Sequence, residues 1–433
     1  MAKHSKPQEK RKIIQLKDHL PGRQPEKEEP KQEQPEEEAP QVSVEYEEEP
    51  ESQDSKKAWQ APKAFYRAAV VLLVAILGLA LWVNRDNLTP QKIWNWLQIQ
   101  ITGDGTGDGF PVSITGSQVT AGNFLYDNGS VVALSDTSLT MVGSSGQEIL
   151  SLRHSFNRPI LKASSGHYLL YNQDGTGYMV ISGTEKKLEK SNKQNILTGA
   201  VAPNGRYALA TEGEEGASTL TVYLSTGEEQ FTYNFAQDYI TSVALNADGT
   251  WAMVCTVRSQ GGELVSKITV FDLNQSTPVG EYESRGNLLV DAYWGSNGVL
   301  YAVGDVSLVR ARSSELSFSE YSYEGRTPTA FQFANGQLYL SISAYEHAGP
   351  CTLLAFRGLD DPVEIPVEER VQALAVSGGS VGALVDQELI LYDSTTGKEL
   401  ARENAGGDAK SVALANESTA YVLGVSEIRK VQF

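Results

Sequence analysis

The chain has 433 residues, with 36 Lys and Arg against 54 Asp and Glu, and a formal net charge of −18 at pH 7. Nucleic-acid binding depends on clustered Lys and Arg, so this acidic balance argues against a nucleic-acid partner. The two cysteines, Cys255 and Cys351, are too few for a disulfide framework or a four-ligand structural zinc site, and we expect two buried free thiols.

Residues 1–60 are rich in Glu, Gln, Lys and Pro and nearly free of aromatic residues. Such a composition cannot bury enough apolar surface to offset the entropy of ordering, so we expect a disordered, charged tail. The tail is basic from Lys3 to Lys17 and mainly acidic from Glu26 to Glu51. Its basic start is suited to contact with anionic lipid, while the rest serves as a spacer or recruits a second partner.

Residues 64–83 read AFYRAAVVLLVAILGLALWV, without a polar side chain from Ala68 onward. A helix of this length matches the roughly 30 Å hydrocarbon layer of a bilayer. A cleaved signal peptide is disfavoured, because the polar stretch ahead of the apolar run is far too long. The sequence therefore predicts one transmembrane helix from Ala64 to Val83, with the lipid bilayer as its partner.

Basic residues on the two sides of this span predict its orientation. Four of them precede or enter it, from Lys56 to Arg67, whereas only Arg85 and Lys92 follow closely. Positive charge is enriched on the cytoplasmic side of a span. We therefore expect a cell-membrane protein with a cytoplasmic N-terminus and with the chain after Val83 outside the cell.

Residues 84–109 connect the predicted span to the rest of the chain. Thr89 and Pro90 suit the N-cap and first position of a short helix whose apolar face includes Trp94. This juxtamembrane helix either lies at the bilayer surface or packs on the folded domain. Residues 102–109 alternate Gly with polar residues and predict a flexible tether.

From residue 110 onward, a turn of small and polar residues followed by a hydrophobic run recurs eight times, at intervals of 37 to 49 residues. Such a spacing, with several strands in each unit, is typical of β-propeller blades. The turns are Asp127-Asn128-Gly129, Ser164-Ser165-Gly166, Pro203-Asn204-Gly205, Ala247-Asp248-Gly249, Ser296-Asn297-Gly298, Ala334-Asn335-Gly336, Ser377-Gly378-Gly379 and Ala415-Asn416-Glu417. The sequence predicts an all-β, eight-bladed β-propeller over 110–433; a seven-bladed ring, with one weak unit miscounted, is the alternative.

The two ends of this region together account for one complete blade. The eighth unit ends at Phe433, straight after its third strand, so an outer strand is missing. The stretch Phe110–Thr115 precedes the first complete unit and has no partners of its own. We expect it to supply the missing strand and close the ring, which removes an open sheet edge.

In the fourth unit we expect the second strand at 251–257 and the third at 267–273.

Two features resemble known families. The turn Asp393–Lys398 (DSTTGK) resembles the repeat of PQQ-like (quinoprotein-like) propellers, although Leu400 and Ala401 stand where that family has a docking tryptophan. This resemblance implies the fold and no quinone cofactor. The order of tail, span, Trp-bearing linker, Gly109–Gly116 (GFPVSITG) and Leu134–Leu139 (LSDTSL) resembles an uncharacterised family of membrane-anchored propellers from Clostridia-type Gram-positive bacteria, which implies a cell-surface location and no assigned activity.

The sequence contains neither a nucleophile elbow nor a P-loop, and its histidines are too few and too dispersed for a metal centre. We therefore predict no enzyme activity, no cofactor and no metal. Propellers bind through the loops that join each outer strand to the next inner strand and each second strand to the third. Candidate binding residues in such loops are Arg153, His154, Phe156, Arg158, Tyr239, Arg285, Tyr345 and His347.

These features predict a membrane-anchored, extracytoplasmic propeller that acts as a binding or scaffolding module for an unknown protein or a cell-wall glycan. One alternative is a cell-surface enzyme acting on carbohydrate, which requires paired carboxylates or an arginine cluster at the central channel. A second alternative is a transmembrane sensor, which requires a folded or phosphorylatable tail.

Overall fold

The computed structural model describes residues 109–116 and 118–433. The predicted tail and membrane span, and the linker up to residue 108, lie outside these residues. In the described part of the chain, no helix has the length and apolar character needed to cross a membrane.

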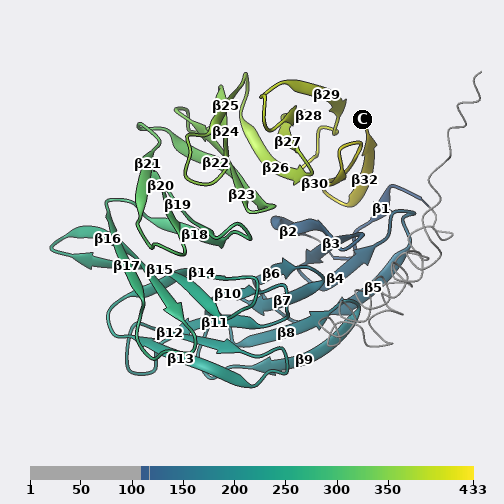
Figure 1. Ribbon diagram of the computed structural model, residues 1–433. Helices are drawn as coiled ribbons and strands as arrows, with labels where there is room; N and C mark the ends of the chain where they lie inside the picture. The colour runs from purple at the N-terminus through teal and green to yellow at the C-terminus, as the bar shows by residue number, and fades with distance from the viewer. Residues whose placement is uncertain (1–108, 117) are drawn as a thin grey trace, which may run out of the picture. The chain divides into compact units, whose positions relative to one another are not determined.

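Within the described residues, 32 strands form eight antiparallel sheets of four strands each (Figure 1). The eight-bladed prediction is confirmed and the seven-bladed alternative is wrong. From inner to outer strand, blades 1 to 4 are β2 (Val119–Asp127), β3 (Ser130–Ser135), β4 (Ser138–Val142), β5 (Glu148–Arg153); β6 (Pro159–Ser164), β7 (His167–Asn172), β8 (Gly177–Ser182), β9 (Glu185–Ser191); β10 (Ile196–Val201), β11 (Tyr207–Glu212), β12 (Ser218–Tyr223), β13 (Glu229–Phe235); and β14 (Tyr239–Leu245), β15 (Trp251–Gln260), β16 (Glu263–Asp272), β17 (Gly280–Arg285).

Blades 5 to 8 continue the same order around the ring. They are β18 (Leu289–Trp294), β19 (Val299–Gly304), β20 (Ser307–Arg312), β21 (Ser319–Ser322); β22 (Thr327–Ala334), β23 (Gln337–Ser343), β24 (Cys351–Phe356), β25 (Val363–Val367); β26 (Val371–Ser377), β27 (Ser380–Val385), β28 (Glu388–Asp393), β29 (Glu399–Asn404); and β30 (Ser411–Asn416), β31 (Thr419–Leu423), β32 (Glu427–Gln432), β1 (Val112–Ser113).

The predicted turns join the inner strand of each blade to its second strand. Between β2 and β3, Asn128 and Gly129 have φ of 49° and 85°, and Ser165–Gly166 and Asn335–Gly336 repeat this left-handed pair. Two consecutive left-handed residues match the twist of a tight hairpin, which explains why Asn, Ser and Gly recur at these positions.

Neighbouring blades pack face to face through shared hydrophobic clusters. In the described residues there are eight such clusters, each built from two adjacent blades. Between blades 5 and 6, for example, Tyr301, Leu340 and Phe356 are fully buried in one cluster. Because every sheet has a neighbour on both faces, second strands such as β3 and β27 are buried along their whole length.

The last blade packs directly against the first. Val131 and Val142 of blade 1 share a cluster with Tyr421 and Leu423 of blade 8. The rings of Tyr126 and Tyr421 stack with centroids 5.8 Å apart, although 294 residues separate them along the chain. The eight blades therefore form a closed ring.

The two segments expected to be neighbours in the last blade lie side by side. In β1, Val112 is opposite Ile428 and Ser113 is opposite Glu427, and the Ile114 N–H donates to the Ser426 carbonyl at 2.9 Å. β1 is the outermost strand of the sheet β1-β32-β31-β30 and pairs with two residues of β32.

The hairpin β15–β16 is longer than the sequence predicted. The strands extend to Gln260 and begin again at Glu263, joined by Gly261 and Gly262, which both have positive φ. The residues near its tip are polar, so the hydrophobic pattern of the sequence did not predict this extension. Elsewhere in the same blade, Cys255 is a buried free thiol, as is Cys351 in β24, as predicted.

We predict that Leu340→Ala, at a fully buried position between blades 5 and 6, lowers the free energy of unfolding by about 2–5 kcal/mol, because the lost side chain leaves a cavity. The control is Leu400→Ala, since Leu400 is 50% exposed on β29 and should change the same quantity by about 0.5 kcal/mol or less. Urea denaturation of the full-length protein measures both, and equal costs would contradict the packing described.

Candidate functional site

Antiparallel pairing brings two classes of loop to one face of the ring, which we call the loop face. It consists of the loops from each outer strand to the next inner strand, such as 154–158, and the loops from second to third strands, such as 136–137. The two classes touch, because a ring nitrogen of His154 lies 3.1 Å from the carbonyl oxygen of Ser135.

The residues proposed from sequence all lie on or beside this loop face, but they do not form one cluster. Arg153 ends β5, and His154, Phe156 and Arg158 follow in the β5–β6 loop. The remaining four are Tyr239 at the start of β14, Arg285 at the end of β17, and Tyr345 and His347 in the β23–β24 loop. They occupy four separate places around the ring.

The β5–β6 loop is fixed by its own contacts. The ring of His154 stacks on Phe156 with centroids 5.1 Å apart, and its Nδ1 accepts the Phe156 N–H at 3.2 Å. Arg158 pairs with Asp174, and its backbone N–H donates to the Asn172 side chain at 2.9 Å. Burial lowers the pKa of His154, opposed by its contacts with Ser135 and Asp136, so the imidazole is neutral near pH 7.

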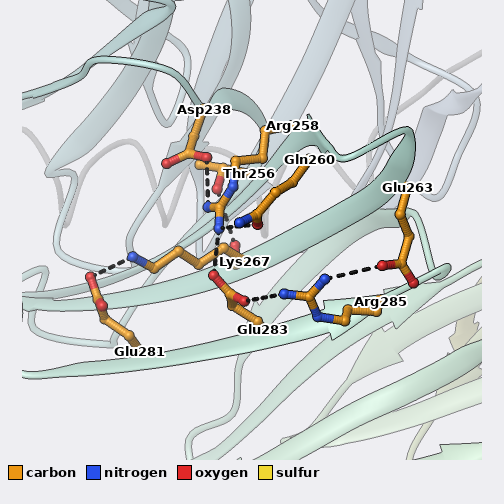
Figure 2. A network of polar contacts seen from close by, with 9 residues as sticks. All are labelled: Asp238, Thr256, Arg258, Gln260, Glu263, Lys267, Glu281, Glu283 and Arg285. Carbon is orange, nitrogen blue, oxygen red and sulfur yellow. Dashed lines mark hydrogen bonds and ion pairs between the residues drawn. The ribbon is translucent and has the colours of Figure 1, made fainter.

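A network of ion pairs crosses the loop-face side of blade 4 (Figure 2). Arg258 donates to Asp238, at 3.0 Å, and to Glu283, while Arg285 contacts Glu283 at 3.3 Å and Glu263 at 3.0 Å. The hydrogen bond from Arg258 lowers the pKa of Glu283. The network therefore ties the β13–β14 loop to the long hairpin and to β17.

Sequence reasoning proposed Arg285 but missed Arg258, which is the centre of this network. Arg258 lies in the unpredicted extension of β15, and its two acidic partners are 20 and 25 residues away in the sequence. No local spacing pattern signals such a contact. Tyr239, next to Asp238 in the sequence, has 58% of its surface exposed.

Exposed apolar side chains are concentrated at the loop face. Among the described residues, six large hydrophobic side chains are strongly exposed, and five of them lie in its loops or at the adjoining strand ends. These five are Tyr239, Val290, Val306, Tyr345 and Val425. The sixth, Leu400, lies on the outer strand β29.

The loops of the same face are acidic. Counted over the described residues, they contain twelve Asp and Glu against five Lys and Arg. Isolated apolar side chains on an acidic background suit a partner that is apolar and neutral or basic, and repel a polyanion.

All eight inner strands line the central channel, whose volume is about 730 Å³. The lining is mainly small and apolar, with Lys162 of β6 and Asp291 of β18 as its two charged side chains, 4.0 Å apart. The paired carboxylates or arginine cluster that the carbohydrate-enzyme alternative requires are not among these lining residues. The sensor alternative depends on the tail, which lies outside the described residues.

No group of three or more His, Cys, Asp and Glu side chains suited to a metal ion occurs within 109–116 and 118–433. Two His of the loop face, His154 and His347, lie in different loops around the ring.

The neutral state of His154 predicts a pH dependence of stability. Its pKa in the folded protein lies below the ordinary value of about 6.5, so the unfolded chain binds the proton more tightly. The free energy of unfolding should therefore fall as the pH drops below about 6.5. We expect His154→Gln to lose less stability than the parent protein between pH 7 and pH 5 in denaturation measurements; identical pH profiles would contradict this assignment.

Comparison with solved structures finds the same fold elsewhere. Sqt1 of Saccharomyces cerevisiae superposes with a TM-score of 0.52 and 12% identity, over 75% of this chain and 100% of that chain. BamB of Moraxella catarrhalis gives a TM-score of 0.45 and 13% identity, over 75% of this chain and 98% of that chain. The likeness to Sqt1 concerns the fold alone.

No curated protein matches the chain in sequence. Residues 112–327, from β1 to the start of β22, match a family model described as a family of unknown function (DUF5711). This part of the propeller is therefore similar to the DUF5711 family, to which no activity is assigned.

Proposed function

We propose that this protein is a single-pass, membrane-anchored propeller that uses its loop face to bind a protein or a cell-envelope glycan. The chain 64–83 spans the bilayer, residues 1–60 lie in the cytoplasm, and the propeller lies outside the cell. In this proposal β1 completes the outer edge of the last blade, and the Gly-rich tether before it sets the distance from the bilayer.

The observation that carries this proposal is the placement of the exposed apolar side chains. Tyr239 and Tyr345 are 58% and 55% exposed, and both lie on the loop face. Aromatic residues at the centre of an interface contribute much of its binding energy. A tyrosine ring also suits stacking on a sugar, so both partner classes remain compatible with this surface.

The rigidity of the loop face also supports a binding role. The ion pairs around Arg258 and Arg285 hold the long hairpin against neighbouring strands, and the His154–Phe156 stack fixes the β5–β6 loop. A surface that is already ordered pays less conformational entropy when a partner binds. The blades thus supply a preformed platform.

Site-specific photo-crosslinking tests this proposal on cells that carry the full-length protein. We predict that a photoreactive residue at position 239 or 345 gives discrete adducts with a partner protein or with glycan fragments. The matched control is position 400, which is similarly exposed but lies on an outer strand.

The double variant Tyr239→Ser, Tyr345→Ser should reduce adduct formation from a third loop-face position, Val306, whereas Leu400→Ser should leave it unchanged. Equal labelling from positions 239, 345 and 400, or none from the loop face, would refute the proposed role of this surface.

A further inference from the structure

The central channel contains a lysine side chain, Lys162, whose ammonium group has no hydrogen-bond acceptor among the described residues. Lys162 lies in β6, whose inner surface lines the channel, and 35% of its side chain is exposed there. Its nearest charged partner is Asp291, which reaches into the channel from blade 5 at 4.0 Å, beyond hydrogen-bond distance. Within the described residues, the Lys162 ammonium forms no hydrogen bond.

Asp291, by contrast, is satisfied by other groups. Its Oδ1 accepts hydrogen bonds from the Ser242 hydroxyl and the Ala292 N–H, both at 2.9 Å, and its Oδ2 accepts from the Tyr293 hydroxyl at 3.3 Å. The protein therefore stabilises the carboxylate without Lys162. Lys162 is therefore the member of the pair with unused hydrogen-bond donors. The negative charge of Asp291 raises the pKa of Lys162, which keeps the ammonium group charged.

An aromatic wall stands beside this pair. Tyr293, whose hydroxyl bonds Asp291, stacks on Phe333 of blade 6 with ring centroids 4.4 Å apart. Phe331 and Trp294 line the same channel. A volume of about 730 Å³ falls within the range of small-molecule sites, which combine apolar walls with a few convergent polar groups.

We propose that the channel binds a small aromatic anion. Its ring would lie on the wall formed by Tyr293 and Phe333, and its terminal oxygens would accept hydrogen bonds from Lys162. A carboxylate and a phosphate monoester offer the same oxygen acceptors to an ammonium group. This site is separate from the loop face and goes beyond the protein-binding role proposed for it.

A purely structural role for the pair makes the opposite prediction. If Lys162 and Asp291 only brace blade 2 against blade 5, removing the Asp291 charge weakens the ring and leaves anion binding unchanged. If Lys162 is an anion site, Asp291 competes with the ligand, and Asp291→Asn tightens anion binding.

Ligand-observed NMR on the full-length protein, with benzoate, phenyl phosphate and benzylamine as probes, tests the proposal. We expect benzoate or phenyl phosphate to bind and benzylamine, which has the wrong charge, not to bind. The tighter of the two anions shows whether the site prefers a carboxylate or a phosphate. Lys162→Met should weaken binding about tenfold or more, and Lys162→Arg should weaken it less.

Asp291→Asn should tighten anion binding by about threefold or more, because the competing charge is gone. Thermal unfolding of each variant checks that it is folded. The comparison of the three probes on the parent protein does not depend on any variant. Anion binding no stronger than that of benzylamine, or binding that is unchanged in a folded Lys162→Met variant, would overturn the proposal.

Discussion

The packing of each blade against its two neighbours is the constraint on which the rest of this molecule depends. Burial of apolar surface is the main favourable term in folding, and here eight clusters supply it, one at each junction around the ring. The junction of Val131 and Val142 with Tyr421 and Leu423 is essential, because without it the first and last sheets would each expose an apolar face.

Polar ties reinforce these junctions where the blades diverge. The guanidinium of Arg310, from blade 5, lies over the rings of Tyr321 and Phe356, 5.8 Å and 5.2 Å from their centroids, and donates to the Asp360 carbonyl at 2.8 Å. Arg357 of blade 6 donates to the Ser394 hydroxyl, at 3.1 Å, in the turn of blade 7 that resembles the PQQ-like repeat. An arginine of the preceding blade thus helps to hold this turn in place. Packing thus occupies both faces of the sheets.

The fold could be predicted from the sequence because its signals are local. Turns such as Asn128–Gly129 and Asn335–Gly336 require left-handed backbone, and only a few residue types tolerate it. The site could be predicted only in part. Loop residues such as Tyr239 and Tyr345 follow from their position in the repeat, whereas Lys162 and Asp291 are 129 residues apart in unremarkable inner strands. Such residues come together only when the ring closes, and no spacing pattern in the sequence indicates their contact.

A double-mutant cycle between Tyr126 and Tyr421 tests ring closure most directly. Each tyrosine is changed to Leu alone and together, and the free energy of unfolding is measured for all four proteins. Because the two rings stack at 5.8 Å, the closed ring predicts a coupling of about 0.5–1.5 kcal/mol. Effects that add to within about 0.3 kcal/mol would mean that the first and last blades do not pack together, and would contradict the account.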